Sequence, residues 1–338
     1  MKLTATYIAA IAAAAGILFS CGTKKDAEAE KRYEVVGYVW EKEGLLPPAD
    51  AVTVINYCFF SPDSTGKGIV VPNESRLLQV MDLKKENPEL KVLFSFGGAN
   101  AKVGYADICA DEQLRREFAD SCRALVDKYG ADGIDFDWEF PHGDEELNNY
   151  VLLLRDLRQA LGKDKMLTIA AGFRSDGLKM PEMLEYLDFV NIMSYDMGWE
   201  APYHHTAMRR SPLCNICTIE ESVDFFLKKG VPYDKLVLGL GYYGRGNGKE
   251  FKHWTDYRDI TPGPGMEERW DSIACVPYIV DSLGTLVVGY DNPRSLEIKC
   301  DYIKEKGFRG AMTWRSELDK DNYELTRTVQ RCLLEDKR

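Results

Sequence analysis

The chain has 338 residues, of which 45% are hydrophobic and 29% are charged. This composition is that of an ordinary globular protein and excludes a fibrous or disordered one. The formal net charge of −11 has the wrong sign for binding a phosphate backbone and excludes nucleic acid as a partner. The length permits two modest domains or one large α/β barrel, since such barrels reach roughly 250 residues as one domain.

The N-terminal segment predicts export and a membrane anchor. Lys2 precedes an apolar run, which is the pattern of a secretory signal peptide over residues 1–20. The run is too short for a membrane span, and no later segment approaches the ~18 apolar residues required. Residues 18–22, Leu-Phe-Ser-Cys-Gly, resemble the bacterial lipobox, with an ordinary cleavage site as the alternative. We therefore expect a lipoprotein anchored to a bacterial membrane through Cys21, on the periplasmic face or cell surface, with residues 21–33 as a charged tether.

The remaining cysteines permit several interpretations. Eight follow the lipidation site, an even number that would allow disulfides in an exported protein. Cys214 and Cys217 form a CxxC motif, with His204 and His205 upstream. A zinc site, a local disulfide and free thiols all fit this motif. Because no second CxxC follows, we expect no metal and favour free thiols.

The body of the chain alternates strand patterns with helical patterns. Helical spacing of apolar residues occurs between most of eight predicted strands, and eight parallel strands close a (β/α)8 TIM barrel. We therefore expect an α/β barrel over residues 34–338; a doubly wound open sheet is the alternative. The Gly- and Pro-rich stretch at about 246–286 is expected to be a small insertion between strand 7 and strand 8. The predicted strands are residues 34–40, 52–60, 91–96, 133–138, 166–172, 189–194, 236–242 and 310–314.

One predicted strand carries three carboxylates on one face. Because side chains alternate along a strand, Asp135, Asp137 and Glu139 point to one side and the apolar residues between them to the other. In a barrel the carboxylates would face the interior and rise toward the C-terminal rim, where barrel active sites lie. Carboxylates spaced ~6–7 Å apart with little water repel one another, so at least one pKa must rise. A raised pKa keeps a proton available near neutral pH, and Glu139 at the rim is the natural donor.

The same residues form part of a longer signature. Residues 132–139, DGIDFDWE, fit the pattern DxxDxDxE, and from about residue 35 to 314 the chain resembles glycoside hydrolase family 18, the chitinases and their relatives. Asp132 is an odd number of residues from the other acids, which puts it on the opposite face of the strand, and it is expected to support the fold. The further similar signatures, each at the end of a predicted strand, are SFGG at 95–98, MSYD at 193–196, YYGR at 242–245 and GAMTW at 310–314.

The resemblance implies a retaining, substrate-assisted endo-hydrolase of β-1,4-linked N-acetylglucosamine, in chitin or chito-oligosaccharides, that needs no cofactor. Glu139 would protonate the glycosidic oxygen and then activate water, while the substrate's acetamido carbonyl acts as the nucleophile. Asp137 would orient the acetamido group with Asp135 beneath it, and Tyr195 would bind the acetamido oxygen. Trp314 would form the aromatic floor. The expected substrate-binding residues are Tyr38, Gly97, Gly98, Met193, Asp196, Trp199, Tyr243, Arg245 and Trp314.

Two alternative functions stay open. One is an endo-β-N-acetylglucosaminidase that cleaves the chitobiose core of N-glycans. The other is an inactive glycan-binding lipoprotein, against which the presence of Glu139 together with Asp137 and Tyr195 argues. Phe140 stands where many family members have tyrosine, so one hydroxyl contact is expected to be lost. We expect a monomer.

Overall fold

The computed structural model describes residues 32–99 and 104–335. The predicted signal peptide, the lipidation residue Cys21 and nearly all of the tether lie outside these residues, so export and anchoring stay predictions. Within the described ranges, no helix has the length and apolar character needed to cross a membrane.

Eight parallel strands form a closed barrel. Their order is β1-β14-β8-β7-β6-β5-β4-β2, and a further pairing of β1 with β2 closes the sheet. An open sheet would leave two unpaired edges, so the predicted TIM barrel is confirmed and the doubly wound alternative is wrong. The observed strands differ from the predicted ones by at most two residues at either end; they are β1 Glu34–Trp40, β2 Val54–Pro62, β4 Lys91–Gly97, β5 Gly133–Asp137, β6 Met166–Gly172, β7 Phe189–Met193, β8 Leu236–Gly241 and β14 Gly310–Trp314.

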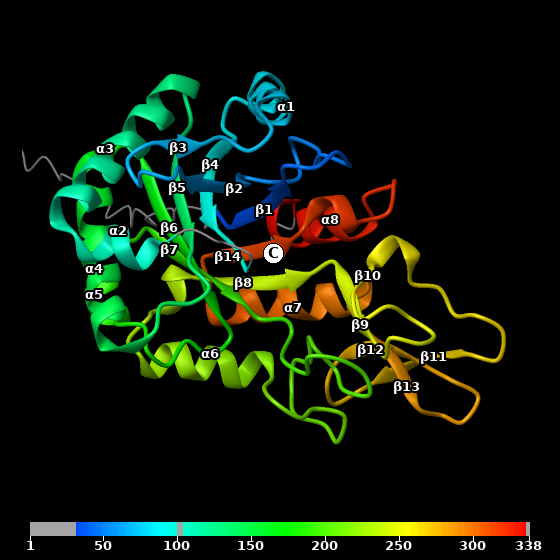
Figure 1. Ribbon diagram of the computed structural model, residues 1–338. Helices are drawn as coiled ribbons and strands as arrows, with labels where there is room; N and C mark the ends of the chain where they lie inside the picture. The colour runs from blue at the N-terminus through cyan, green and yellow to red at the C-terminus, as the bar shows by residue number, and fades with distance from the viewer. Residues whose placement is uncertain (1–31, 100–103, 336–338) are drawn as a thin grey trace, which may run out of the picture. The chain divides into compact units, whose positions relative to one another are not determined.

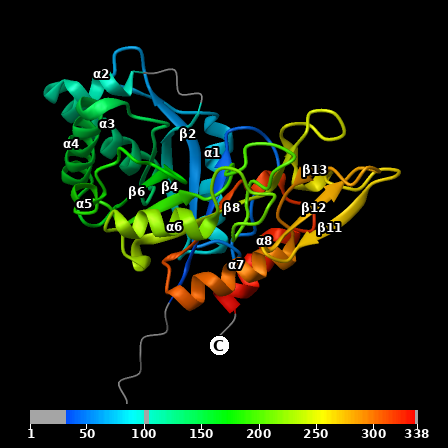
Figure 2. The same ribbon diagram turned by 90° about the horizontal axis from the view of Figure 1, so that it is seen from below.

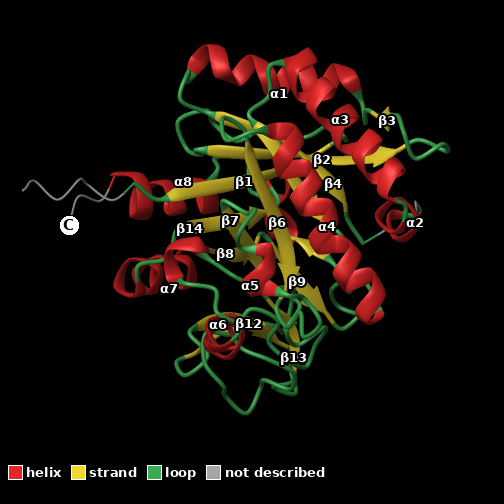
Figure 3. Cartoon of the chain, turned by 90° about the vertical axis from the view of Figure 1, so that its left-hand side faces the viewer, coloured by secondary structure: helices red, strands yellow, loops and turns green. Residues whose placement is uncertain are grey.

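Helices connect most of these strands and lie outside the barrel, as Figures 1 and 3 show. Local signals set their ends: the Asp111 side chain accepts a hydrogen bond from the backbone N–H of Leu114 at the start of α3, and Gly130 ends that helix in the left-handed conformation. The first connection, between β1 and β2, contains no helix. The helices are α1 Glu74–Glu86, α2 Tyr105–Ala110, α3 Glu112–Tyr129, α4 Gly143–Leu161, α5 Met180–Met183, α6 Ile219–Lys228, α7 Pro293–Lys306 and α8 Glu324–Gln330.

The insertion forms a second, antiparallel sheet. It has five strands in the order β10-β9-β13-β12-β11, and it begins directly after β8 and ends just before α7, so it is slightly longer than residues 246–286. Figures 1 and 2 show it beside the barrel, on the side away from α2 to α5. Its strands are β9 Tyr243–Gly246, β10 Thr255–Asp256, β11 Glu267–Asp271, β12 Val276–Val280 and β13 Leu286–Gly289. One further short strand, β3 Ile69–Val70, pairs with β2.

The two faces of β5 separate apolar from acidic residues as the alternation predicts. Phe136 packs outward, with ring centroids 6.5 Å from Phe118 of α3 and 5.8 Å from Tyr150 of α4. Asp135 and Asp137 are therefore directed into the barrel, where both are buried. The apolar contacts with the helices hold the strand that carries the acids.

Candidate active site

Asp135 is held in the barrel interior by four hydrogen bonds from four different strands. Its Oδ2 accepts from the hydroxyls of Tyr38 (2.6 Å) and Ser95 (2.7 Å), and its Oδ1 accepts from the Thr168 hydroxyl (2.6 Å) and the Asn191 amide (3.2 Å). Burial raises the pKa of Asp135, and these hydrogen bonds oppose the rise because they stabilise the carboxylate. Asp135, Asp137 and Glu139 together form the acidic column, and Asp135 is its fixed, innermost member.

Asp137 lies one step nearer the rim and has a different environment. It is only 3% exposed, and its Oδ1 is buried without a hydrogen-bond partner. Burial, followed by the negative charges of Glu139 and Asp135, raises the pKa of Asp137 well above its usual range. The carboxyl group therefore holds its proton more readily than an ordinary aspartate does, and its unpartnered oxygen is available for a ligand.

Glu139 lies two residues beyond the end of β5, at the rim, and its side chain is half-buried. Burial and the negative charge of Asp196 raise the pKa of Glu139 from 4.5 to about 7, while a hydrogen bond from the backbone of Ala99 acts in the opposite direction. A carboxyl group with this pKa is present in both its protonated and its ionised form near neutral pH. It can therefore donate a proton in one step and accept one in the next.

Asp196, which follows β7, is held as a permanent negative charge. Its Oδ1 accepts hydrogen bonds from the Tyr243 hydroxyl (2.7 Å) and from Nε of Arg245 (2.6 Å), and its Oδ2 accepts from Nη2 of Arg245 (2.6 Å). Burial alone would raise the pKa of Asp196, but the hydrogen bonds and positive charge of Arg245 act against burial, and the pKa lies below its usual range. Asp196 consequently supplies the fixed charge that Glu139 experiences.

Aromatic side chains surround the acidic column. Trp314, at the end of β14, is half-buried and has ring-centroid distances of 5.4 Å to Tyr38 and 5.8 Å to Phe59. The Tyr195 hydroxyl lies 3.9 Å from Sδ of Met312, and burial raises the pKa of this tyrosine well above its usual range. The tyrosine therefore stays protonated and can donate a hydrogen bond. Trp314 ends β14 and Tyr195 follows β7 by two residues, so both rings belong to the carboxyl ends of barrel strands, the end at which Glu139 follows β5.

Gly97 and Gly98 hold β4 against the acidic strand. Gly97 has a φ of 115°, and a Cβ atom there would overlap the carbonyl oxygen of Asp137. The backbone N–H of Gly98 donates to that same carbonyl oxygen at 2.8 Å, and a Cβ on Gly98 would meet the ring of Phe59. The contacts of both glycines are thus with the backbone that positions Asp137, and direct sugar contact by them stays a prediction.

The other predicted site residues lie at different depths. Tyr38 is fully buried with its hydroxyl on Asp135, so its contact with substrate stays a prediction. Trp199 is 61% exposed, and the guanidinium of Arg245 lies 5.3 Å from its ring centroid. Met193 ends β7 and is half-buried. Asp132 accepts hydrogen bonds from Lys84 and from the backbone of Val92, which agrees with its expected role in the fold.

Four residues of the site were not predicted as site residues: Ser95, which was named only as part of the SFGG signature, and Thr168, Asn191 and His205. Thr168 and Asn191 are the single strongly polar positions in the apolar strands β6 and β7, and this isolation was a usable signal for an inward-facing role. In the sequence, His205 is marked only by its place upstream of the CxxC motif. Its contacts with Asp196 arise from the conformation of the loop after β7, and the spacing of apolar residues in the sequence does not predict loop conformations.

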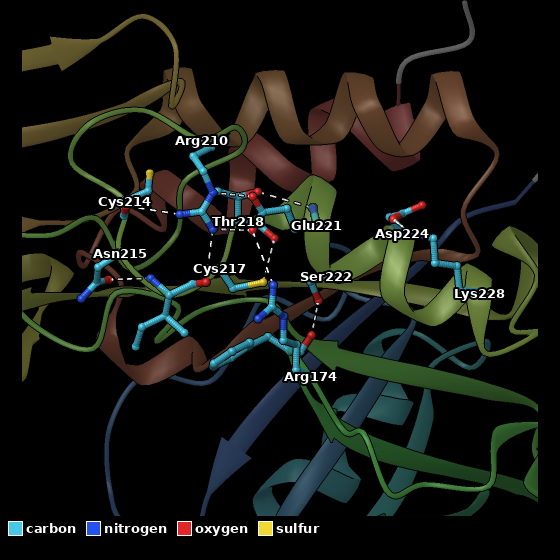
Figure 4. A network of polar contacts seen from close by, with 12 residues as sticks. Arg174, Arg210, Cys214, Asn215, Cys217, Thr218, Glu221, Ser222, Asp224 and Lys228 are labelled. Atoms are coloured by element: carbon cyan, nitrogen blue, oxygen red, sulfur yellow. Dashed lines mark hydrogen bonds and ion pairs between the residues drawn. The ribbon is translucent and has the colours of Figure 1, made fainter.

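Arg210 contacts the backbone of the CxxC motif (Figure 4). Arg210 forms a bidentate ion pair with Glu221 of α6, at 2.5 and 2.6 Å. It also donates to the carbonyl oxygens of Cys214 (3.3 Å) and Ile216 (3.2 Å). In Figure 4 the sulfur atoms of Cys214 and Cys217 point to different sides. None of the eight described cysteines is in a disulfide. Over residues 32–99 and 104–335, no group of three His, Cys, Asp or Glu is placed to hold a metal ion.

Comparison with known proteins points to one family. The profile of "Glycosyl hydrolases family 18" matches residues 34–319. The chain is 29% identical to Chitinase A1 of Niallia circulans over 304 residues, covering 74% of this chain and 44% of that protein. It is 30% identical to the endochitinase of Manduca sexta over 289 residues, covering 70% and 52%. The chain therefore spans about half the length of these curated relatives.

A solved structure shares both the sequence similarity and the fold. It is the glycoside hydrolase family 18 N-acetylglucosaminidase of Paenibacillus barengoltzii, 30% identical, with a TM-score of 0.79. The match covers 89% of this chain and 100% of that one. The resemblance thus extends over the whole barrel and its insertion.

Proposed function

The chain belongs to family 18 of the glycosyl hydrolases, and we propose that it is a retaining, substrate-assisted endo-hydrolase of β-1,4-linked N-acetylglucosamine in chitin or chito-oligosaccharides. The observation that carries this proposal is the environment of Glu139, whose pKa of about 7 makes it a proton donor at the barrel rim. The similarity to chitinases supports the substrate class. The complete acidic column argues against an inactive glycan-binding protein.

Glu139 would act first as an acid and then as a base. In its protonated form it would donate to the glycosidic oxygen as the bond to the leaving sugar breaks. The resulting carboxylate would then take a proton from the water that attacks the intermediate. A pKa near the working pH suits both steps, because neither protonation state is scarce.

Asp137 and Tyr195 would handle the acetamido group of the substrate. The buried, unpartnered Oδ1 of Asp137 can accept the acetamido N–H. As positive charge develops on that group, the ionised form of Asp137 becomes favoured, and Asp135 beneath it would take up the proton that Asp137 gives up. The Tyr195 hydroxyl would donate to the acetamido oxygen, and the half-buried ring of Trp314 would support the apolar C–H face of the sugar.

A second candidate is the release of single N-acetylglucosamine residues from a chain end. The observation that favours it is the 30% identity to the N-acetylglucosaminidase of Paenibacillus barengoltzii, all of whose chain is covered. The two functions share the chemistry at Glu139 and differ only in how many sugars bind on each side of the cleavage point.

Product analysis on chitotetraose tests the proposal and separates these functions. Internal cleavage yields chitobiose, whereas release from an end yields N-acetylglucosamine and chitotriose at equal initial rates. The matched control is the fully deacetylated tetrasaccharide, which we expect to remain intact because it lacks the internal nucleophile. Its cleavage at a comparable rate would refute the substrate-assisted mechanism. Cleavage of a high-mannose glycopeptide with chitotetraose left intact would instead support the N-glycan alternative.

The pH dependence gives an independent measurement on the same reaction. Because the protonated form of Glu139 is needed first, we expect kcat/KM to fall as pH rises through about 7. An activity that keeps rising well above that pH would contradict the assignment of Glu139 as the acid.

We propose further that the protein is exported and anchored by a lipid on Cys21, a proposal supported by the sequence of residues 18–22. Replacement Cys21→Ser should release the protein from the membrane fraction of a bacterial host. A serine variant that fractionates with the membrane as the native chain does would contradict the proposal.

A further inference from the structure

Two adjacent histidines in the loop between β7 and α6 are equally buried but have different partners. Nε2 of His204 lies 3.2 Å from Oδ2 of Asp271 at the end of β11. Nε2 of His205 lies 3.2 Å from the carbonyl oxygen of Tyr243, and Nδ1 lies 3.4 Å from the backbone nitrogen of Asp196. Of the two, His205 is the one that contacts the residues at the barrel rim.

The partners of His205 define its proton arrangement. A carbonyl oxygen can only accept a hydrogen bond, so Nε2 carries the hydrogen; a backbone N–H can only donate, so Nδ1 is the acceptor. The neutral ring with its proton on Nε2 satisfies both contacts at once. A doubly protonated ring would lose the bond from the Asp196 backbone and would direct Nδ1–H toward Oδ1 of Asp196, 3.6 Å away.

The contact with His205 supports an unusual backbone conformation. Asp196 has a φ of 59°, in the left-handed region that non-glycine residues rarely adopt. Its backbone N–H is bound by the His205 ring, and the N–H of the next residue, Met197, donates to the His205 carbonyl at 3.0 Å. The peptide groups on both sides of Asp196 are thus tied to one residue.

We propose that His205 is a positioning residue that, by binding the Asp196 backbone, directs the Asp196 carboxylate toward Glu139 and the substrate. This inference rests on the proposed function, since it concerns the same reaction. His205 also steadies a second ligand of that carboxylate: its ring lies 5.0 Å from the ring of Tyr243, whose hydroxyl binds Asp196.

The orientation of Asp196 has an electrostatic consequence that can be measured. The negative charge of Asp196 helps to raise the pKa of Glu139, so an Asp196 that turns away should let that pKa fall. The descending limb of kcat/KM would then move to lower pH. The charged and titratable groups near these two carboxylates are Asp137 on β5, Tyr195 beside β7, and Tyr243 and Arg245 on β9.

Three variants of similar polarity test the inference. His205→Gln can still donate to the Tyr243 carbonyl but places no acceptor near Nδ1, whereas His205→Asn keeps an acceptor for the Asp196 N–H. His204→Gln is the matched control, because it alters an equally buried neighbour that faces Asp271 instead. The measurements are kcat and KM on chitotetraose as functions of pH, the thermal unfolding temperature, and the pKa of Glu139 by NMR of carboxyl-labelled protein.

We expect His205→Gln to lower kcat/KM by about 10- to 100-fold and to move its descending limb to lower pH. In His205→Asn the fall of kcat/KM should return to the pH at which it occurs in the native chain. In His204→Gln it should stay at that pH even if the unfolding temperature falls. The inference would be overturned if kcat/KM fell at the same pH in the native chain and all three variants. It would also be overturned if both glutamine variants moved that fall to lower pH by the same amount. If the native chain does not hydrolyse chitotetraose, the proposed function fails while the NMR pKa of Glu139 still decides the role of His205.

Discussion

Replacing Glu139 with glutamine should remove activity and at the same time stabilise the fold at neutral and alkaline pH. Glutamine has the shape of the acid but cannot ionise. In the folded protein the pKa of Glu139 is about 7 instead of 4.5. A rise of about 2.5 pH units corresponds to about 3 kcal/mol, since each unit is worth about 1.36 kcal/mol.

The sign follows from the two protonation equilibria. Below pH 4.5 the carboxyl group is protonated in both the folded and the unfolded chain, so it carries no charge penalty. As pH rises from 4.5 to about 7, the unfolded chain ionises first and the native protein loses stability. Above about 7 the group is ionised in both states, and the loss of about 3 kcal/mol is complete. The glutamine variant does not undergo this loss.

Urea unfolding at a series of pH values, followed by tryptophan fluorescence, measures the effect. The free energy of unfolding of Glu139→Gln minus that of the native chain should grow by up to about 3 kcal/mol between acidic and mildly alkaline pH. Loss of the neighbouring charge also lowers the pKa of Asp137, which adds to the gain in the same direction. Hydrolysis should fall by about 10²-fold or more. Parallel stability curves for the two proteins, or native-like turnover by the variant, would refute the reasoning.

Two further substitutions test how the acids are positioned. Gly97→Ala should destabilise the fold by about 3 kcal/mol or more, because its Cβ would overlap the Asp137 carbonyl oxygen. The control is Gly130→Ala, which is also at positive φ but in open space and should cost about 1–2 kcal/mol. Similar unfolding temperatures for the two variants would contradict this difference. Arg245→Met removes both charged hydrogen bonds to Asp196, so the pKa of that carboxyl should rise, as NMR of carboxyl-labelled protein would measure; an unchanged pKa of Asp196 would argue against the role of this ion pair.

The barrel and the acidic strand could be predicted because both are local patterns. Period-two alternation places Asp135 and Asp137 on one face of β5 without any knowledge of the neighbouring strands. The partners of Asp135 could not be found in this way. Thr168 lies opposite Asp135 only because β6 pairs with β5 in one register, and Asn191 joins them from β7, so both contacts depend on lateral strand pairing. That register is set by packing over the entire barrel.

His205 illustrates a second kind of limit. In the sequence the two adjacent histidines are related only to the CxxC motif downstream, which gave a zinc site as one alternative and gave no reason to place His205 beside Asp196. In the structure the loop after β7 turns back on itself, so that the His205 carbonyl accepts from Met197 and its ring reaches the backbone of Asp196. The loop conformation depends on left-handed residues whose φ angles have no simple pattern along the chain.

The three carboxylates of the acidic column have the same chemistry, and their surroundings alone distinguish them. Asp135 accepts four hydrogen bonds and is fixed, whereas Asp137 has a buried oxygen with no partner and an acid on either side. Glu139 stands beyond the strand, half-open, with its pKa near neutrality. Along β5 the carboxyl groups therefore change from rigidly bonded to free to exchange protons. The group best able to transfer a proton is thus the one at the rim, the end of the barrel at which active sites of this fold lie.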